Sequence, residues 1–325
     1  MASINQYYAK LPAQMLGHSG KTEIPPQLFW PTQLDKQVPP RPNPQAAIAR
    51  WKFNELRPIL LEAGDIVSAE EAERRLLMLV NPSLQAPYTT DTIYAGLQLA
   101  LPGEIAPAHR HVAFALRFIV EGSGGFTAVE GDKILLQRGD VILTPSWHWH
   151  DHGNEGKDPM IWLDGLDLPL YQFARVNFAE TYSEKTYPSK PTNYSKLRSP
   201  WAETQRQLDA GAGTHSIYHY RHQDGSQLPR TLGAQAECVI ASSTTPWSCE
   251  TTSFVYHIFE GQGYSELQQG TDSELQKIEW TRGDTFSVPA WTRIRHVNIQ
   301  ASGNAYLFAV SDRPIIESLG LYRQT

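Results

Sequence analysis

Two stretches of the chain decide the fold: residues 103–122 read GEIAPAHRHVAFALRFIVEG, and residues 139–154 read GDVILTPSWHWHDHGN. The first stretch carries His109 and His111, and the second carries His150, 39 residues after His111. Short apolar runs separated by Gly, Pro and Asp predict β-strands joined by turns. Three imidazoles held by one such β-structure predict a metal centre inside it.

The alternation of side chains around the two neighbouring histidines supports this hypothesis. In a single strand with period two, one face of residues 109–117 would carry His109, His111, Ala115 and Arg117. The other face would carry Phe114, Leu116 and Phe118. Buried imidazoles and a buried guanidinium need partners, and a metal ion and an anion would supply them. The alternative is that His-x-His is an ordinary surface or core pair.

Composition limits the classes of function. At 325 residues and 36.5 kDa the chain is long enough for about two domains. Its 28 Lys+Arg against 34 Asp+Glu include no basic tract, so no nucleic-acid or membrane partner is expected. Two cysteines cannot form a disulfide framework, and no signal peptide or membrane span is recognisable, so a cytoplasmic location is expected.

The N-terminal region predicts two different structures. Residues 1 to about 65 contain PPQLFWP and VPPRPNP, which argue against long regular elements and for an arm packed on the barrel or on a neighbouring subunit. Ser68-Ala-Glu-Glu71 resembles a capping box and predicts a helix running through LLMLV (76–80). On that helix, Arg74 and Arg75 would either help bind a carboxylate or be solvated.

Strand signals begin at about Asp91, and an internal repeat then organises the chain. The first copy contains Glu121-Gly-Ser-Gly124, Arg138-Gly-Asp140, Pro145-Ser-Trp147 and His152. The second copy contains Glu260-Gly-Gln-Gly263, Arg282-Gly-Asp284, Pro289-Ala-Trp291 and His296. The steps from Asp to Pro to His are 5 and 7 residues in both copies. The sequence therefore predicts two related β-domains.

The second copy has different residues at the positions that carry the chemistry. Ser248, Glu250 and Ile294 align with His109, His111 and His150, and Tyr256 aligns with Arg117. Serine and isoleucine cannot replace imidazole, so the second domain is predicted to hold no equivalent metal ion.

The segment Gly103-x5-His109-x-His111-x3-Ala115-x6-Gly122, followed by Gly139-x5-Pro145-x-Trp147-x2-His150-x3-Asn154, resembles the two cupin motifs. Two departures matter. Ala115 stands where many cupins supply a glutamate ligand, and Trp147 replaces the usual glycine. The resemblance therefore implies three neutral histidine ligands, His109, His111 and His150, without a carboxylate.

The wider strings APAHRH, ALRFIVEG, TPSWHWHDHGNEG and WLDGLDLPL resemble gentisate 1,2-dioxygenase and the related salicylate and 1-hydroxy-2-naphthoate dioxygenases, over roughly residues 65 to 315. The implied fold class is mainly β, a bicupin of two double-stranded β-helix (jelly-roll) barrels with an N-terminal arm and short helices. The expected division is 1–90 arm and helix, 91–170 metal-binding barrel, 171–230 linking segment, and 231–325 second barrel without metal ligands. The resemblance also implies a homotetramer.

Four further residues are candidates for catalysis. Arg117 is expected to bind the substrate carboxylate, or otherwise to pair with an acidic residue. Gln98 resembles the family's active-site glutamine. His152 is a candidate proton acceptor, although the recurrence of His296 in the other copy favours a structural bond. Asp164 would polarise a hydroxyl group or orient His152, or is an ordinary turn residue. His148 is predicted to face elsewhere.

The resemblance implies an Fe(2+) enzyme with O2 as co-substrate and a small aromatic 2-hydroxycarboxylate as substrate. For gentisate, cleavage between the carboxyl-bearing and hydroxyl-bearing ring carbons would give maleylpyruvate. Salicylate and 1-hydroxy-2-naphthoate are alternative substrates. A metal-dependent cupin isomerase or hydrolase and a non-catalytic ligand-binding cupin are alternatives of other classes.

Overall fold

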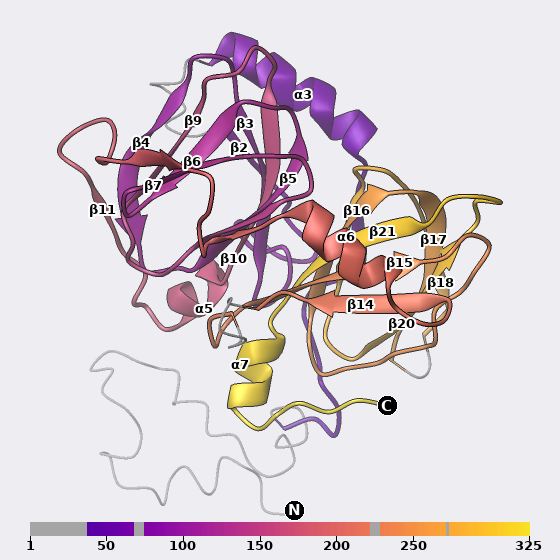
Figure 1. Ribbon diagram of the computed structural model, residues 1–325. Coiled ribbons are helices and arrows are strands. Elements are labelled where there is room, and N and C mark those ends of the chain that lie inside the picture. The colour runs from indigo at the N-terminus through magenta and orange to yellow at the C-terminus, as the bar shows by residue number, and fades with distance from the viewer. Residues whose placement is uncertain (1–37, 68–74, 222–227, 271–272) are drawn as a thin grey trace, which may run out of the picture. The chain divides into compact units, whose positions relative to one another are not determined.

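The computed structural model describes residues 38–67, 75–221, 228–270 and 273–325, and residues 44–325 form one compact unit. Strands dominate this unit, and the strand runs predicted from the sequence are confirmed (Figure 1). VILTP, MIWLDGLDL, FVYHIF, DTFSVP and AYLFAV all contain strands. These strands form two barrels, one from each copy of the repeat.

The first barrel consists of two six-stranded sheets, with the orders β13-β8-β5-β10-β3-β2 and β11-β4-β9-β6-β7-β12. Neighbouring strands are antiparallel except β12 and β7, which are parallel. The strands are β2 (Arg75–Met78), β3 (Tyr94–Ala100), β4 (Ile105–His111), β5 (Ala115–Glu121), β6 (Gly125–Val129), β7 (Asp132–Leu135), β8 (Val141–Thr144), β9 (His150–Asn154), β10 (Met160–Leu166), β11 (Ala179–Thr181), β12 (Lys190–Thr192) and β13 (Arg198–Ser199).

The second barrel combines a six-stranded sheet, β1-β19-β16-β21-β15-β14, with a three-stranded sheet, β18-β17-β20. Its first strand comes from the N-terminal region. The strands are β1 (Ala49–Trp51), β14 (His215–His219), β15 (Gly233–Val239), β16 (Phe254–Glu260), β17 (Gln262–Gln269), β18 (Gln276–Thr281), β19 (Thr285–Val288), β20 (Thr292–Asn298) and β21 (Ala305–Ser311).

Backbone contacts show that the two copies of the repeat fold alike. His109 pairs with His150 across β4 and β9, and Ser248 pairs with Ile294 in the same way. The backbone N–H of Trp147 donates to the carbonyl of His111, as that of Trp291 donates to the carbonyl of Glu250. Both tryptophans have positive φ angles, 64° and 61°. The alignment of the copies made from sequence is therefore confirmed at the backbone.

The segment 171–230, which was expected to link the two barrels, contributes strands to both of them. Strands β11, β12 and β13 join the first barrel, and β14 joins the second. Three short helices accompany the strands, α5 (Leu168–Phe173), α6 (Trp201–Asp209) and α7 (Arg313–Ser318). Helices α5 and α7 each follow the last strand of a repeat.

The predicted helix after Ser68 is wrong. The expected lack of long regular elements before about residue 65 is wrong at Phe53–Ile66, and residues 1–37 of the expected arm lie outside the described residues. The capping box lies in residues 68–74, outside the described residues, but Arg75–Met78 of the expected helix form β2. This segment pairs with β3, so tertiary pairing overrides its helical propensity. The helix lies earlier, as α3 (Phe53–Ile66), and includes Pro58. Its buried Gly64 approaches Leu99 and Leu101, because it has no side chain to separate the helix from them.

The barrels share an apolar core. Phe118 of β5 stacks on Phe308 of β21, with ring centroids 4.3 Å apart. Leu116 and Phe118 belong to this shared cluster, whereas Ile119 belongs to a separate cluster with Met160. Strand β5 therefore presents its apolar face to the second barrel and its other face to the interior of its own barrel.

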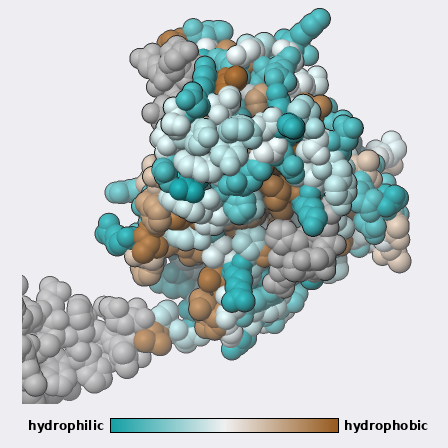
Figure 2. Space-filling model, turned by 60° about the vertical axis from the view of Figure 1, so that its left-hand side comes forward, coloured by the Kyte–Doolittle hydropathy of each residue, from teal (hydrophilic) through white to brown (hydrophobic). Residues whose placement is uncertain are grey.

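The exposed large apolar side chains include Phe173, Val176 and Phe178, which lie close together in the sequence. On the face that Figure 2 shows, hydrophobic residues form small groups among hydrophilic ones. Within the described part of the chain, no helix has the length and apolar character that crossing a membrane requires.

Two buried aspartates connect the barrels in equivalent ways. Asp167, which precedes α5, accepts hydrogen bonds from the backbone N–H of Phe114 at 2.8 Å and from the hydroxyl of Thr231. Asp312, which precedes α7, accepts from the backbone N–H of Ser253 at 2.7 Å and from the hydroxyl of Thr92. Each carboxylate thus holds a turn of its own barrel and a threonine that leads into the other. Burial raises the pKa of each to about 6.

This pKa makes the stability of the fold depend on pH. An aspartate in an unfolded chain has a pKa near 3.9, so the folded state favours the protonated Asp312 carboxyl. The contribution of Asp312 to the stability of the folded state is fully present below about pH 4 and is lost as pH rises through 6. Asparagine has no charge to bury. We therefore expect the free energy of unfolding of Asp312→Asn to rise by about 3 kcal/mol relative to that of the parent chain as pH is raised from 4 to 7. Urea unfolding at a series of pH values measures this. The exposed Asp158→Asn should show no such gain, and parallel curves for Asp312→Asn would contradict the prediction.

Candidate active site

Three histidines converge inside the first barrel. Strand β4 carries His109 and His111, and the adjacent strand β9 carries His150. One ring nitrogen of each histidine lies within 4.8 Å of the corresponding nitrogens of the other two. The ring centroid of His150 is 4.0 Å from that of His109 and 4.8 Å from that of His111. The pairing of β4 with β9 thus brings together residues that are far apart in sequence.

The backbone orients each of these imidazoles. Each Nδ1 lies within hydrogen-bond distance of a carbonyl oxygen two residues away: His109 with Pro107 at 2.9 Å, His111 with Ala113 at 2.7 Å, and His150 with His148 at 2.8 Å. A carbonyl only accepts, so each neutral ring carries its proton on Nδ1 and leaves a lone pair on Nε2. The Nε2 of His150 is buried and has no hydrogen-bond partner in the described part of the chain.

This arrangement fits a metal ion. Histidine ligands commonly donate the proton of one ring nitrogen to a carbonyl and bind the metal through the other. Burial lowers the pKa of His150 well below its ordinary value, and the nearby His109, Arg117 and His111 add to the effect. The neutral imidazole that results is the form that binds metals.

A cavity of about 240 Å³ adjoins the histidines. All four candidate catalytic residues line it, namely Gln98, Arg117, His152 and Asp164, together with His109 and His111. His150 is fully buried and is not among the lining residues. The cavity is therefore bounded by two of the three histidines, a guanidinium, a carboxylate and an amide.

Arg117 and Asp164 form a buried ion pair across strands β5 and β10. The Nε atom of Arg117 is 3.1 Å from Oδ1 of Asp164, and both side chains are at most 5% exposed. Arg117 also donates to the hydroxyl of Thr144, and the indole N–H of Trp162 donates to Asp164. Asp164 is therefore not an ordinary turn residue. The described contacts connect it to Arg117 and Trp162.

The other two candidates are also buried. His152 lies on β9, and its Nδ1 is 3.0 Å from the hydroxyl oxygen of Thr127. In the second barrel, Nδ1 of His296 is 2.7 Å from the hydroxyl oxygen of Ser265. Because this contact recurs in both barrels, it favours a structural role for the bond. The two histidines differ in one respect: among the described residues, only His152 adjoins a three-histidine group. Gln98, at the centre of β3, is 3% exposed.

Comparisons with known proteins agree with this geometry. The pattern of the cupin domain family matches residues 96–166. Gentisate 1,2 dioxygenase 1 of Aquipseudomonas alcaligenes is 34% identical over 90% of both chains. The chain belongs to the gentisate 1,2-dioxygenase family.

Two further relatives show the breadth of this family. The 5-aminosalicylate 1,2-dioxygenase of a Comamonas species is 34% identical over 84% of this chain and 80% of that one. The crystal structure of salicylate 1,2-dioxygenase from Pseudoaminobacter salicylatoxidans in adducts with gentisate superimposes with a TM-score of 0.83. It is 31% identical and covers 90% of this chain and 88% of that chain. The protein is a bicupin and a ring-cleaving dioxygenase of this family.

The path of the chain through the site differs from the sequence prediction in one respect. Residues 109–117 were expected to form a single strand, but β4 ends at His111 and β5 begins at Ala115. The two strands belong to different sheets, so the chain turns a corner between them. His111 and Arg117 nevertheless reach the same cavity, from two walls of the barrel. Arg75 was expected either to help bind a carboxylate or to be solvated. It pairs with Glu104 and donates to the carbonyl of Val67.

Sequence reasoning missed several residues of this dioxygenase site. Tyr94 lines the cavity, and its place on the same strand face as Gln98 was a usable signal. Asn177 also lines it, but it comes from the segment before β11, where the sequence offers no motif. Thr144 and Thr127, which contact Arg117 and His152, carry no signal of their own.

The three-histidine geometry predicts one metal ion per chain. We expect His111→Ala to weaken the binding of a divalent metal by more than about 100-fold, because removing a ligand should exceed the 10- to 100-fold effect typical of outer-shell partners. The metal-to-protein ratio after anaerobic Fe(II) loading and gel filtration measures this. His148→Ala is a matched control, because His148 lies outside the group. Equal metal content in the two variants would contradict the assignment.

Proposed function

We propose that the enzyme cleaves the aromatic ring of gentisate between the carbon that bears the carboxylate and the adjacent carbon that bears the hydroxyl. O2 is the co-substrate. One observation carries the proposal: Arg117 and two members of the three-histidine group, His109 and His111, line a single cavity of about 240 Å³. Such a cavity offers a metal centre and a carboxylate partner to the same small molecule.

His109, His111 and His150 are the proposed ligands of Fe(II). Three neutral nitrogens leave the full +2 charge on the ion and about three coordination positions open. When bound, iron orients a 2-hydroxycarboxylate and mediates electron flow from the ring to O2. The chain contributes the orientation of the ligands, because the carbonyls of Pro107, Ala113 and His148 hold the imidazoles.

Arg117 is the proposed partner of the substrate carboxylate. Its planar guanidinium matches a carboxylate in geometry, and burial strengthens such a contact. Before substrate binds, Asp164 balances its charge at 3.1 Å. The substrate carboxylate would then approach a guanidinium that Asp164 and Thr144 already hold in position.

His152 is the proposed acceptor of the substrate hydroxyl proton. Its Nδ1 contacts Thr127, so the proton would be received on Nε2. Gln98, which lines the same cavity, would donate a hydrogen bond from its amide to the substrate or to O2. In this account Asp164 positions Arg117 and does not accept the proton.

Tyr94 supports gentisate as the substrate. Gentisate has a second ring hydroxyl, and Tyr94 lines the cavity, with its own hydroxyl buried just beneath the wall. Gly96 leaves room for that phenol, because a Cβ at position 96 would lie 2.8 Å from the Tyr94 hydroxyl oxygen. Salicylate, 5-aminosalicylate and 1-hydroxy-2-naphthoate remain alternative substrates of the same site.

We also propose the wider setting of the enzyme. Residues 91–170 would supply the catalytic barrel and residues 231–325 the barrel without metal ligands. Phe173, Val176 and Phe178 are 88%, 52% and 56% exposed, which supports assembly into a homo-oligomer, with a tetramer as the expected state. The expected location is the cytoplasm.

Oxygen consumption tests the proposed function. Protein loaded anaerobically with Fe(II) is mixed with gentisate, salicylate, 5-aminosalicylate or 1-hydroxy-2-naphthoate, while O2 uptake and the ultraviolet spectrum are recorded. We expect gentisate to give the highest kcat/KM and the spectrum of maleylpyruvate. Absence of O2 uptake with all four compounds would refute the proposal. Turnover that continues with Zn(II) and without O2 would instead indicate a cupin isomerase or hydrolase.

A substitution at Tyr94 tests how the substrate is chosen. We expect Tyr94→Phe to lower kcat/KM for gentisate by about 10-fold, because a site that hydrogen-bonds a substrate hydroxyl loses about 1 to 1.5 kcal/mol when that bond is removed. Salicylate lacks this hydroxyl, so its kcat/KM should change less than about twofold. Equal losses for the two substrates would show that Tyr94 shapes the cavity without reading the second hydroxyl.

A further inference from the structure

The second barrel has a cavity of its own at the position that corresponds to the active site. Its volume is about 310 Å³, against about 240 Å³ in the first barrel. Ser248, Glu250 and Ile294, which replace the three histidines, all line it. The second barrel has therefore lost the three histidines while keeping the space beside them.

Strand register identifies the other replacements. Gln98 pairs with Trp162 of β10 and Leu76 of β2. In the second barrel, Glu237 pairs with Leu307 of β21 and Ile217 of β14, so it stands where Gln98 stands. An amide in the catalytic cavity thus corresponds to a carboxylate here.

Glu237 is ionised although it is only 2% exposed. It accepts hydrogen bonds from the hydroxyl of Tyr256 at 3.0 Å and from the amide of Gln235 at 2.8 Å, and Nε2 of His215 lies 2.7 Å away. Burial alone would raise the pKa of Glu237, but the bond with His215 and the nearby His296 bring it to about 2. The inner wall of the cavity therefore carries a carboxylate that three neighbouring polar groups hold in position.

A second carboxylate replaces a metal-ligand position. Glu250, at the position of His111, accepts a hydrogen bond from the hydroxyl of Thr252 at 2.9 Å and pairs with Arg313. Tyr256 stands where the first barrel has Arg117, so the partner for an anionic substrate is gone. Among the lining residues, two carboxylates face one guanidinium, and Phe254, Tyr256 and Tyr322 add aromatic surface.

We propose that the cavity of the second barrel binds a small organic molecule that carries a protonated amino group. The ammonium would lie near Glu237 and Glu250, and the carbon skeleton against the aromatic side chains. A barrel that served only as a scaffold would be more stable with apolar side chains in this space than with buried charges around a hollow. A carboxylate ligand would meet Glu237 without the arginine of the first barrel, because the one lining guanidinium, Arg313, already pairs with Glu250.

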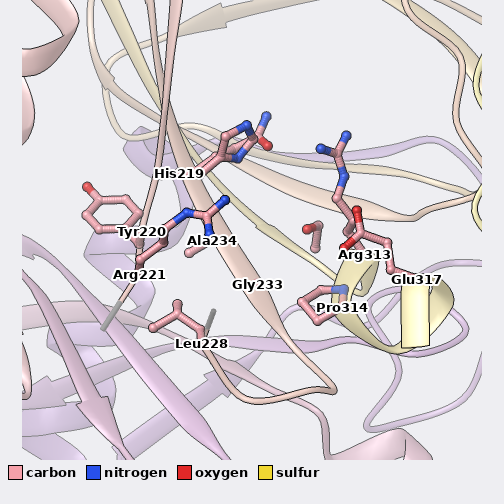
Figure 3. A pocket seen from close by; sticks show the side chains of 11 residues that line it. His219, Tyr220, Arg221, Leu228, Gly233, Ala234, Arg313, Pro314 and Glu317 are labelled. Carbon is pink, nitrogen blue, oxygen red and sulfur yellow. The ribbon is translucent and has the colours of Figure 1, made fainter. Parts of the chain in front are cut away.

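A smaller cavity adjoins this site. It has a volume of about 120 Å³ and shares His219, Gln235 and Arg313 with the larger one. Figure 3 shows His219 and Arg221 on one side of it and Arg313 and Glu317 of α7 on the other. Arg221 lines only this smaller cavity and Arg313 lines both, so the amino group of the ligand is expected at the end of the larger cavity that lies beside Glu237.

Three probes of similar size separate charge from shape: benzylamine, benzyl alcohol and benzoate. Each is titrated calorimetrically into the full chain after anaerobic loading with Fe(II), at neutral pH, without O2 and with saturating gentisate to occupy the first barrel. We expect benzylamine to bind one site per chain, benzyl alcohol to bind at least about 10-fold more weakly, and benzoate to show no binding. No binding of benzylamine, or equal binding of benzoate, would overturn the proposal.

Variants assign the binding to the second barrel. Glu237→Gln and Glu250→Gln keep the shape of the side chain and remove its charge, so each should raise the Kd of benzylamine about 10-fold or more. Glu155→Gln, whose carboxylate is exposed in the first barrel, should leave the Kd unchanged. Thermal unfolding checks that each variant is folded. If Glu237→Gln does not fold, Glu250→Gln and the cavity-filling Ser248→Phe carry the test, and an unchanged Kd in both would refute the assignment.

Discussion

The site depends on how three imidazoles are held in one buried space. Each Nδ1 is bound by a carbonyl only two residues away, so the backbone of β4, of β9 and of the turns beside them sets the direction of each ring. Rings fixed in this way point their Nε2 atoms at a common centre, and an ion there satisfies all three. The surrounding barrel keeps β4 and β9 adjacent and so preserves the distances between the rings.

Comparison of the two barrels separates the scaffold from the chemistry. The contact between Thr127 and His152, the left-handed turn at Trp147 and the aspartate before α5 all recur in the second barrel, where no three-histidine group exists among the described residues. These features therefore belong to the scaffold of the barrel and not to its chemistry. His109, His111, His150, Arg117 and Gln98 do not recur. The proposed reaction would therefore depend on a small set of side chains placed on a common frame.

The sequence predicted the strands and the repeat because their signals are local: alternating apolar residues and turn residues at fixed spacing. It failed where tertiary pairing decides. Leu76 and Leu77 have helical propensity, yet they pair with β3 and form a neighbouring strand. The corner between His111 and Ala115 was also missed, because alternation of side chains alone does not show that a chain passes from one sheet to another. Asn177 reaches the cavity only through the pairing of β11 with β4, which no local pattern reveals.

The ion pair of Arg117 with Asp164 explains how an arginine can be buried before an anion binds to it. A guanidinium that is 4% exposed and has no counter-ion would cost several kcal/mol in the empty cavity. Asp164 removes that cost, but it also cancels most of the charge that would attract a carboxylate. In the proposed function, Arg117 would therefore contribute chiefly the geometry of recognition, and a metal ion held by the histidines would supply the positive charge. An anionic substrate would then bind well only to the metal-loaded protein, so its affinity would depend on the metal content. The second barrel, with glutamates at the positions of Gln98 and His111, has neither contribution and is suited to the opposite charge.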